Sequence, residues 1–300
     1  MEYFIELFLG GLTRGSIYAL IALGYTMVYG IIQLINFAHG EIYMIGAFVA
    51  YIVCGVLTIY GFHGVSILII AGLLAIVYSC AYGYTLEKVA YRPLRNAPRL
   101  APLISAIGMS IFLQNYVLLA QTSDFLPFPS LIPNFAFMEP IAHIIGSPEL
   151  VILVTTLVTM ILLTLLIRYT KIGKAMRATQ QDMSMARLVG INVDRVISMT
   201  FVIGSALAAI GGVLVASYIG QVNFYIGFIA GVKAFTAAVL GGIGSVPGAV
   251  IGGLVLGLTE SFAAGYISSD YEDVFAFGLL VLILILRPSG IMGRTTKQKV

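Results

Sequence analysis

Four ionisable residues stand alone within or beside long apolar segments of this 300-residue chain: Arg14, Glu41, Lys233 and Glu260. A charged side chain is costly in hydrocarbon and usually faces the interior of a helical bundle or a pore. Lys233 and Glu260 lie on either side of a glycine-rich stretch, so they can pair if the two flanking segments pack together. One interpretation is a structural ion pair, and the other is direct contact with a substrate.

A second group of polar residues separates two apolar segments between positions 33 and 41. It contains Asn36, His39, Gly40 and Glu41 and has no turn-rich loop. Polar backbone at membrane depth is tolerated only where it faces protein or a water-filled cavity. Broken helices of this kind build transporter sites, because their free ends supply backbone dipoles. The alternative is a short cytoplasmic turn in which Asn36 caps the following helix.

Glycine is the third notable feature, at 33 of 300 residues. The stretch 241–248 reads G-G-I-G-S-V-P-G and includes Gly242 and Gly244, which predicts a hinge between two helices. Small residues four apart, Ala208 with Gly212 and Gly248 with Gly252, are typical of close helix packing. The alternative for these positions is a helix break that lines a pathway.

The elements that position these residues follow from composition. The chain is 60% hydrophobic and 10% charged, with a mean hydropathy of +1.02. Soluble domains carry about 25% charged residues, so this chain must be surrounded by lipid. Residues without charge fill six segments: 15–40, 42–86, 100–123, 150–167, 196–232 and 234–259. Each is long enough for a helix of about 20 residues, and none alternates as a barrel strand would. The sequence therefore predicts an all-α, polytopic membrane protein.

The charges indicate its orientation. Basic residues gather in three clusters: Lys88, Arg92, Arg95 and Arg99; Arg168, Lys171, Lys174, Arg177, Arg187 and Arg195; Arg287, Arg294, Lys297 and Lys299. Residues 121–149, which include Asp124, Glu139 and Glu149, and the acidic stretch 270–273 have no Lys or Arg. Basic loops face the cytoplasm. We therefore predict about nine crossings (eight to ten), with broken or re-entrant segments between 228 and 266, the N-terminus outside and the C-terminus inside.

One cytoplasmic segment has amphipathic character. The pattern predicts a single helix from Lys174 to Val189, followed by Gly190 and by a cap for the next span at Asn192 or Asp194. One predicted face holds Lys174, Arg177, Gln180, Gln181, Ser184 and Arg187. The other holds Ala175, Ala178, Met185, Ala186 and Val189, with Asp182 interrupting it. The apolar face lacks the bulky anchors of membrane-surface helices, which favours docking into a protein groove. The alternative is a helix that rests on lipid headgroups.

Motifs for catalysis are missing. The sequence has no G-x-x-x-x-G-K-[ST] phosphate loop, no H-E-x-x-H and no G-x-S-x-G. It therefore offers no means of hydrolysing ATP, and we expect no enzyme activity, no metal site, no cofactor and no nucleic-acid partner for this chain.

Four motifs in order carry a resemblance to a known family: N-F-A-H-G at 36–40, T-K-I-G-K-A-M-R-A at 170–178, A-R-L-V-G-I at 186–191 and the glycine stretch 241–248. Together they resemble the branched-chain amino acid permease family of bacterial ABC importers. The resemblance implies a single transmembrane permease domain over 1–300, a periplasmic loop at 121–149 and a cytoplasmic coupling loop at 169–195. It implies a bacterial inner-membrane location and alternating access for branched-chain amino acids.

The resemblance also implies partners. These are a second homologous permease, two cytoplasmic ATPase subunits that hold ATP and Mg, and a periplasmic amino-acid-binding protein. The candidate coupling residues are Gly173, Lys174, Arg177, Ala178, Ala186, Arg187 and Gly190. The candidate pathway residues are Asn36, His39, Gly40, Glu41, Lys233, Gly242, Gly244 and Glu260.

Two other functions remain as alternatives. An ion-coupled secondary amino acid transporter needs intramembrane carboxylates in pairs or relays, and only Glu41 and Glu260 are available. A channel needs charge rings or a carbonyl filter, and neither is evident.

Overall fold

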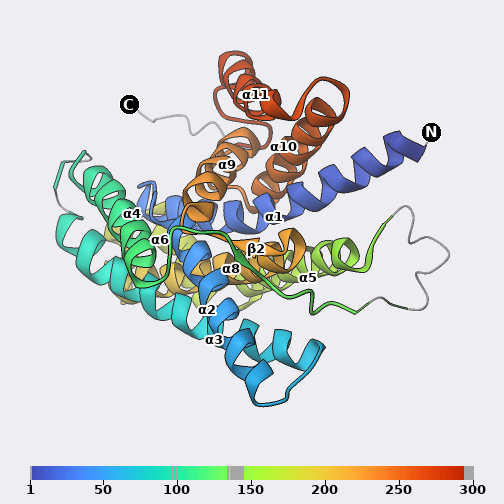
Figure 1. The fold of residues 1–300 in the computed structure, drawn as a ribbon. Coiled ribbons are helices and arrows are strands. Elements are labelled where there is room, and N and C mark those ends of the chain that lie inside the picture. The colour runs from blue at the N-terminus through green and yellow to red at the C-terminus, as the bar shows by residue number, and fades with distance from the viewer. Residues whose placement is uncertain (1, 96, 99, 134, 136–144, 294–300) are drawn as a thin grey trace.

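The computed structural model describes residues 2–95, 97–98, 100–133, 135 and 145–293 (Figure 1). Its α-helices are α1 (Glu2–Ile32), α2 (His39–Ile59), α3 (Val65–Leu86), α4 (Leu100–Ala120), α5 (Ser147–Tyr169), α6 (Lys171–Gln181), α7 (Met183–Leu188), α8 (Val193–Ile219), α9 (Ile226–Gly241), α10 (Val246–Tyr266) and α11 (Glu272–Leu286). A π-helix η1 (Glu87–Tyr91) and a 3₁₀ turn η2 (Arg92–Leu94) extend α3, and a 3₁₀ turn η4 (Ser269–Tyr271) precedes α11. Arg99, Glu139, Arg294, Lys297 and Lys299 of the charge pattern lie outside the described residues.

The fold is an all-α membrane bundle, as predicted. Within the described ranges, seven helices are long and apolar enough to cross a membrane: α1, α2, α3 with its extension, α4, α5, α8 and α10. Helix α9 is a shorter apolar helix of 16 residues, and α11 has 15 residues. The prediction of nine crossings requires both short helices to span, and it stays a prediction together with the orientation of the termini.

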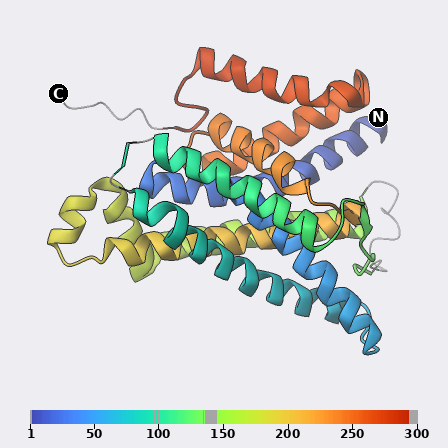
Figure 2. The ribbon, with the colours of Figure 1, turned by 60° about the vertical axis from the view of Figure 1, so that its left-hand side comes forward.

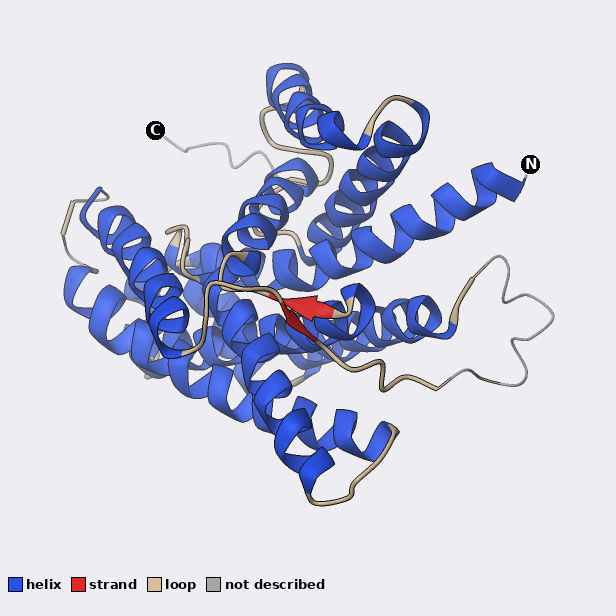
Figure 3. Ribbon diagram, viewed as in Figure 1, coloured by secondary structure: helices blue, strands red, loops and turns tan. Residues whose placement is uncertain are grey.

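The connections between helices gather at two ends of the bundle, as expected for a chain that crosses a membrane back and forth (Figure 2). At one end, strands β1 (Leu126–Pro127) and β2 (Gln221–Val222) pair antiparallel (Figure 3), and the Tyr3 hydroxyl donates to the Gly265 carbonyl at 2.8 Å. At the other end, Arg92 and Arg95 both pair with Asp194. The predicted outer loop 121–149 therefore meets the segment after α8, and the predicted cytoplasmic segments 88–99 and 168–195 meet each other.

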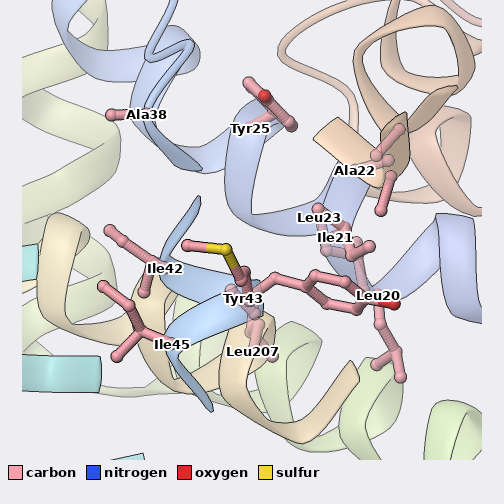
Figure 4. Close-up of a cluster of buried hydrophobic side chains, with 14 of the residues drawn as sticks. Leu20, Ile21, Ala22, Leu23, Tyr25, Ala38, Ile42, Tyr43, Ile45 and Leu207 are labelled. Atoms are coloured by element: carbon pink, nitrogen blue, oxygen red, sulfur yellow. The ribbon is translucent and has the colours of Figure 1, made fainter. Parts of the chain in front are cut away.

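The core forms where α1, α2 and α8 cross. Leu20 and Leu23 of α1, Ile42 and Tyr43 of α2, and Leu207 of α8 are all buried there (Figure 4). By contrast, at most 22% of the best spanning window of α3, α4 or α5 is buried inside the protein. Their outward faces carry large exposed apolar side chains, which is the arrangement that lipid contact requires.

Glycine allows the central helices to approach closely. A Cβ atom on Gly15 of α1 would lie 2.8 Å from the Leu254 Cα atom of α10, and one on Gly253 would lie 2.8 Å from the Ala19 Cα atom. The predicted small-residue positions behave in the same way, because Gly212 packs on Tyr43 and Gly252 packs on Gly241. These contacts confirm the close-packing interpretation of the small residues.

One helix prediction is wrong. The segment Lys174–Val189 is not a single helix, because it breaks at Asp182 into α6 and α7. The Asp182 carboxylate accepts hydrogen bonds from the backbone N–H groups of Ser184 and Met185 at 2.8 and 2.9 Å. Asp182 therefore acts as the N-cap of α7, a position that its short side chain favours over a helix interior.

Candidate functional site

The predicted pathway residues lie in three separate places. The first is the beginning of α2, with Asn36, His39, Gly40 and Glu41; the second is an ion cluster with Lys233 and Glu260; the third is the α9–α10 turn with Gly242 and Gly244. The structure thus brings some candidates together and separates the three groups.

Asn36 is held by a hydrogen bond from η1, the π-helix that extends α3. Its side-chain oxygen accepts from the Tyr91 hydroxyl at 3.0 Å, and the same hydroxyl lies 3.2 Å from the Ile35 carbonyl. Asn36 is only 2% exposed. The N-cap of α2 is Ala38, which makes no side-chain cap hydrogen bond. The alternative in which Asn36 caps this helix is therefore wrong, because Ala38 holds the N-cap position and the Asn36 side-chain oxygen accepts from Tyr91.

His39, Gly40 and Glu41 are buried between helices. The His39 ring packs edge-on against Tyr25 of α1, with ring centroids 4.9 Å apart. A Cβ atom on Gly40 would lie 2.8 Å from the Gly231 Cα atom, so α2 and α9 cross at this point. Glu41 is fully buried, and one of its oxygens accepts from the Ser110 hydroxyl of α4 at 2.9 Å. Among the described residues, its other oxygen has no hydrogen-bond partner.

Lys233 and Glu260 form the predicted ion pair, with Nζ and Oε1 3.1 Å apart. Lys233 also lies 2.7 Å from Asp273 Oδ1 and 3.5 Å from Glu272 Oε1. The second Glu260 oxygen accepts from the Tyr18 hydroxyl at 2.7 Å. The predicted pairing of Lys233 with Glu260 is therefore confirmed, and direct contact of either residue with a substrate stays a prediction.

Arg14 joins the same ion cluster. Its Nη1 atom donates to Glu272 Oε2 at 3.1 Å, across 258 positions of sequence. Sequence reasoning marked Arg14 as isolated and did not connect it with Glu272 or Tyr18. The available signal was weak: Glu272 and Asp273 are adjacent acids at the start of the last apolar segment, with no basic residue nearby.

A cavity of about 470 Å³ opens beside the ion cluster. Its charged wall is formed by Arg14, Lys233 and Glu272. Its other lining residues are Ile17, Tyr18, Tyr43, Phe125, Val215, Tyr218, Ile219, Gln221, Asn223, Ile226, Ile229 and Ala230. Asn36, His39, Gly40 and Glu41 do not line it, so Lys233 is the one predicted pathway residue that does.

The predicted hinge is a tight turn at the other end of α9. Gly242 and Gly244 have φ angles of +103° and +94°, which glycine adopts without steric cost. The Met292 N–H group donates to the Gly241 carbonyl at 2.9 Å, so the segment after α11 runs beside this turn. A Cβ atom on Gly244 would lie 3.9 Å from the Gln180 amide nitrogen, which places α6 near the turn as well.

The segment formed by α6, α7 and the residues up to Gly190 has both buried and exposed side chains. Gly173, Met176 and Thr179 of α6 and Ala186 of α7 are buried. The candidate coupling residues Lys174, Arg177, Arg187 and Gly190 are exposed, and Ala178 is half-buried. The predicted apolar face is wrong as a unit, because the break at Asp182 divides its residues between two helices. Met185 and Val189 are exposed. Gly190, with φ of +85°, ends α7 as predicted, and Asn192 caps α8 through the Arg195 N–H group at 3.0 Å.

Comparison with known proteins decides the family. Residues 7–284 match the family described as "Branched-chain amino acid transport system / permease component". The chain belongs to this permease family. It is 52% identical to the high-affinity branched-chain amino acid transport system permease protein LivH of Escherichia coli (strain K12), over 99% of this chain and 98% of LivH.

Other relatives agree. The corresponding permease protein BraD of Pseudomonas aeruginosa is also 52% identical, with the same coverage. The probable branched-chain amino acid transport permease protein LivH of Methanocaldococcus jannaschii is 27% identical over 96% of this chain and 92% of its own length. No solved structure matches the chain.

Membership of the permease family confirms the resemblance carried by the four motifs. The chain is a permease component of the branched-chain amino acid transport type, so it is a transport subunit and not an enzyme. Its apolar helices agree with a multi-pass membrane location.

Proposed function

We propose that this chain is the permease subunit of an ATP-binding-cassette importer that moves branched-chain amino acids across the bacterial inner membrane. The observation that carries the proposal is the family match over residues 7–284, together with 52% identity to LivH over 99% of the chain. The partners are a second homologous permease, two ATPase subunits that bind ATP and Mg, and a periplasmic binding protein. This chain itself then needs no nucleotide site.

The α6–α7 segment is the proposed docking site for an ATPase subunit. Met185, Leu188 and Val189 of this segment are 62%, 80% and 75% exposed, and Arg187 lies among them. A cluster of exposed apolar side chains beside a basic group is typical of a protein-binding surface. Lys174 and Arg177 extend the basic character along α6.

The same segment touches elements that reach the other end of the bundle. The Gln180 amide lies beside Gly30, near the end of α1, and beside Gly244 in the α9–α10 turn. Helix α1 continues without a break to Arg14 and Tyr18, which line the cavity. Movement of α6 on ATP binding would therefore shift α1 against α10, and the pathway would switch from outward-open to inward-open. Gly242 and Gly244 would act in this step as the turn that lets α9 and α10 move.

The first experiment is an affinity purification of the tagged chain from mildly solubilised native membranes. The expected result is co-purification of a second permease and nucleotide-binding subunits. We expect ATPase activity that rises when binding protein and leucine are added together, and not when either is added alone. A lone chain that catalyses uptake without ATP would contradict the proposal and favour the ion-coupled secondary transporter.

A further inference from the structure

The cavity beside the ion cluster combines two kinds of wall. Arg14 and Glu272 lie on one side, with side chains 43% and 27% exposed. Branched aliphatic side chains lie elsewhere in the lining, among them Val215, Ile226 and Ile229. A volume of about 470 Å³ falls within the ~300–1,000 Å³ range of small-molecule sites.

The ion cluster leaves specific groups free for a ligand. The Lys233 ammonium already faces Glu260, Asp273 and Glu272, so its donors are engaged. Within the described part of the chain, Arg14 makes one hydrogen bond, from Nη1 to Glu272. A guanidinium carries five N–H donors in a planar fork that matches a carboxylate. Most of the Arg14 donors are therefore available for an incoming carboxylate.

Among the three carboxylates of the cluster, Glu272 alone lines the cavity. Glu260 is fully buried behind Tyr18 and Lys233. Lys233 lies near both Glu260 and Glu272, so it acts as a positioning residue that holds Glu272 at the wall. An ammonium group inside the cavity and beside Glu272 would gain a charge-assisted hydrogen bond to its carboxylate.

We propose that this cavity binds the amino acid as a zwitterion, with Arg14 facing its α-carboxylate, Glu272 facing its α-ammonium, and Val215, Ile226 and Ile229 surrounding its branched side chain. This rests on the proposed function and adds a binding site to it. The cluster holds two cations and three carboxylates, so it disfavours amino acids with a second carboxylate. The apolar wall disfavours polar side chains, whose hydrogen bonds would stay unmade there.

The site lies at the end of the bundle predicted to face the periplasm. Phe125, which precedes β1, and Gln221, which begins β2, both contribute to its lining. These strands join the two loops that border the cavity. The position suits a site that receives the amino acid from a binding protein before the bundle switches.

The decisive test is a change of side-chain specificity in the complete transporter. Ile229→Phe fills part of the cavity, and Ile69→Phe is the matched control on α3, where Ile69 is 58% exposed and does not line the cavity. Both are measured in proteoliposomes with partner subunits, binding protein and ATP, with leucine and alanine as alternative substrates. We expect Ile229→Phe to lower leucine uptake about tenfold relative to alanine uptake, since one methylene in an apolar pocket changes discrimination by about 10–200-fold. The control keeps the wild-type ratio.

The charged wall is tested by Arg14→Gln and Arg14→Lys. We expect Arg14→Gln to raise the KM for leucine about tenfold or more, and Arg14→Lys to restore part of the loss, because a lysine keeps the charge without the fork. Assembly is checked by co-purification of the partner subunits with each Arg14 variant, and an unchanged KM for leucine in Arg14→Gln would overturn the role of Arg14 in the site.

A labelling experiment gives a readout that does not depend on turnover. Ile229→Cys is introduced in a background with Cys54→Ala and Cys80→Ala and is exposed to a membrane-impermeant maleimide from the outer side. Leucine delivered by the binding protein should slow its labelling several-fold, whereas Ser123→Cys on the exposed outer loop should label at an unchanged rate.

The outcomes separate the two proposals. If the wild-type complex transports leucine but Ile229→Phe keeps the wild-type specificity, or if leucine leaves the labelling of Ile229→Cys unchanged, the binding site is wrong and the proposed function stands. If the wild-type complex transports no branched-chain amino acid, the proposed function is wrong, and the ligand named for this cavity is wrong with it.

Discussion

Removal of the Lys233 charge should destabilise this protein far more than removal of the Glu260 charge with which it pairs. Within the described residues, Lys233 is the one cation that pairs with Glu260, and the Glu260 side chain is fully buried. In Lys233→Met, Glu260 keeps only the hydrogen bond from Tyr18. A buried charge that loses its counter-ion costs about 3–5 kcal/mol of unfolding free energy.

Glu260→Gln leaves a different situation. Lys233 still has Asp273 at 2.7 Å and Glu272 at 3.5 Å, and the glutamine keeps an oxygen for the Tyr18 hydroxyl. Since the Asp273 and Glu272 side chains are 56% and 27% exposed, solvent screens these pairs. The expected loss is about 1 kcal/mol or less, typical of one pair among several in contact with water. The double variant Lys233→Met with Glu260→Gln removes both charges, and should recover at least about 2 kcal/mol relative to Lys233→Met alone.

The assay is equilibrium unfolding of the purified chain in mixed micelles, followed by helix content. Lys171→Met serves as the control, because Lys171 is exposed at the beginning of α6 and its loss should change stability by less than about 0.5 kcal/mol. Equal losses for the two single variants would refute the reasoning. So would a double variant that is no more stable than Lys233→Met, because the cost would then arise from packing and not from an unpaired charge.

Three further predictions concern packing, the Asn36 hydrogen bond and coupling. Gly40→Ala should lower the free energy of unfolding by about 1–3 kcal/mol, because it overpacks α2 against Gly231. Gly55→Ala in the same helix, where a Cβ meets nothing within 4 Å, should raise it by about 0.5–1 kcal/mol. Unfolding in mixed micelles measures both variants, and equal effects would contradict the close contact between Gly40 and Gly231. Tyr91→Phe should cost about 1–3 kcal/mol by leaving Asn36 Oδ1 unpaired, while Tyr60→Phe at a 77% exposed position should be neutral, and thermal unfolding compares the pair. Charge reversal at Arg177 and Arg187 should lower ATP-driven leucine uptake at least ~10-fold, with normal membrane insertion. This corresponds to a loss of about 1.4 kcal/mol in the free energy of docking. Unchanged uptake in proteoliposomes would argue against docking through α6 and α7.

Sequence reasoning was strongest where one property of the solvent decides the outcome. Long stretches without charge and without the alternation of barrel strands can be satisfied in lipid as helices, where every backbone N–H and C=O group finds a partner within its own segment. The segments 42–86 and 100–123 therefore predict α2, α3 and α4 closely. Local capping was also readable, since Gly190 and Asn192 act over a few residues.

The break at Asp182 shows the limit of periodicity. A helical wheel from Lys174 to Val189 treats Asp182 as an interruption of the apolar face. In the structure its carboxylate satisfies two backbone N–H groups and begins a new helix. A continuous helix and two capped helices share this pattern of residue types, so the sequence pattern did not distinguish them.

The sequence by itself determined that this chain is a helical membrane protein of the permease family, that its charges fall into separated groups, and that Lys233 and Glu260 are able to pair. Only the tertiary structure decided which groups share a site. Arg14 meets Glu272 from 258 positions away, and Asn36 meets Tyr91 from 55 positions away. The physical reason is that contacts between helices depend on how α1, α2, α9 and α10 cross, and those crossings are set by glycine-sized spaces between distant segments.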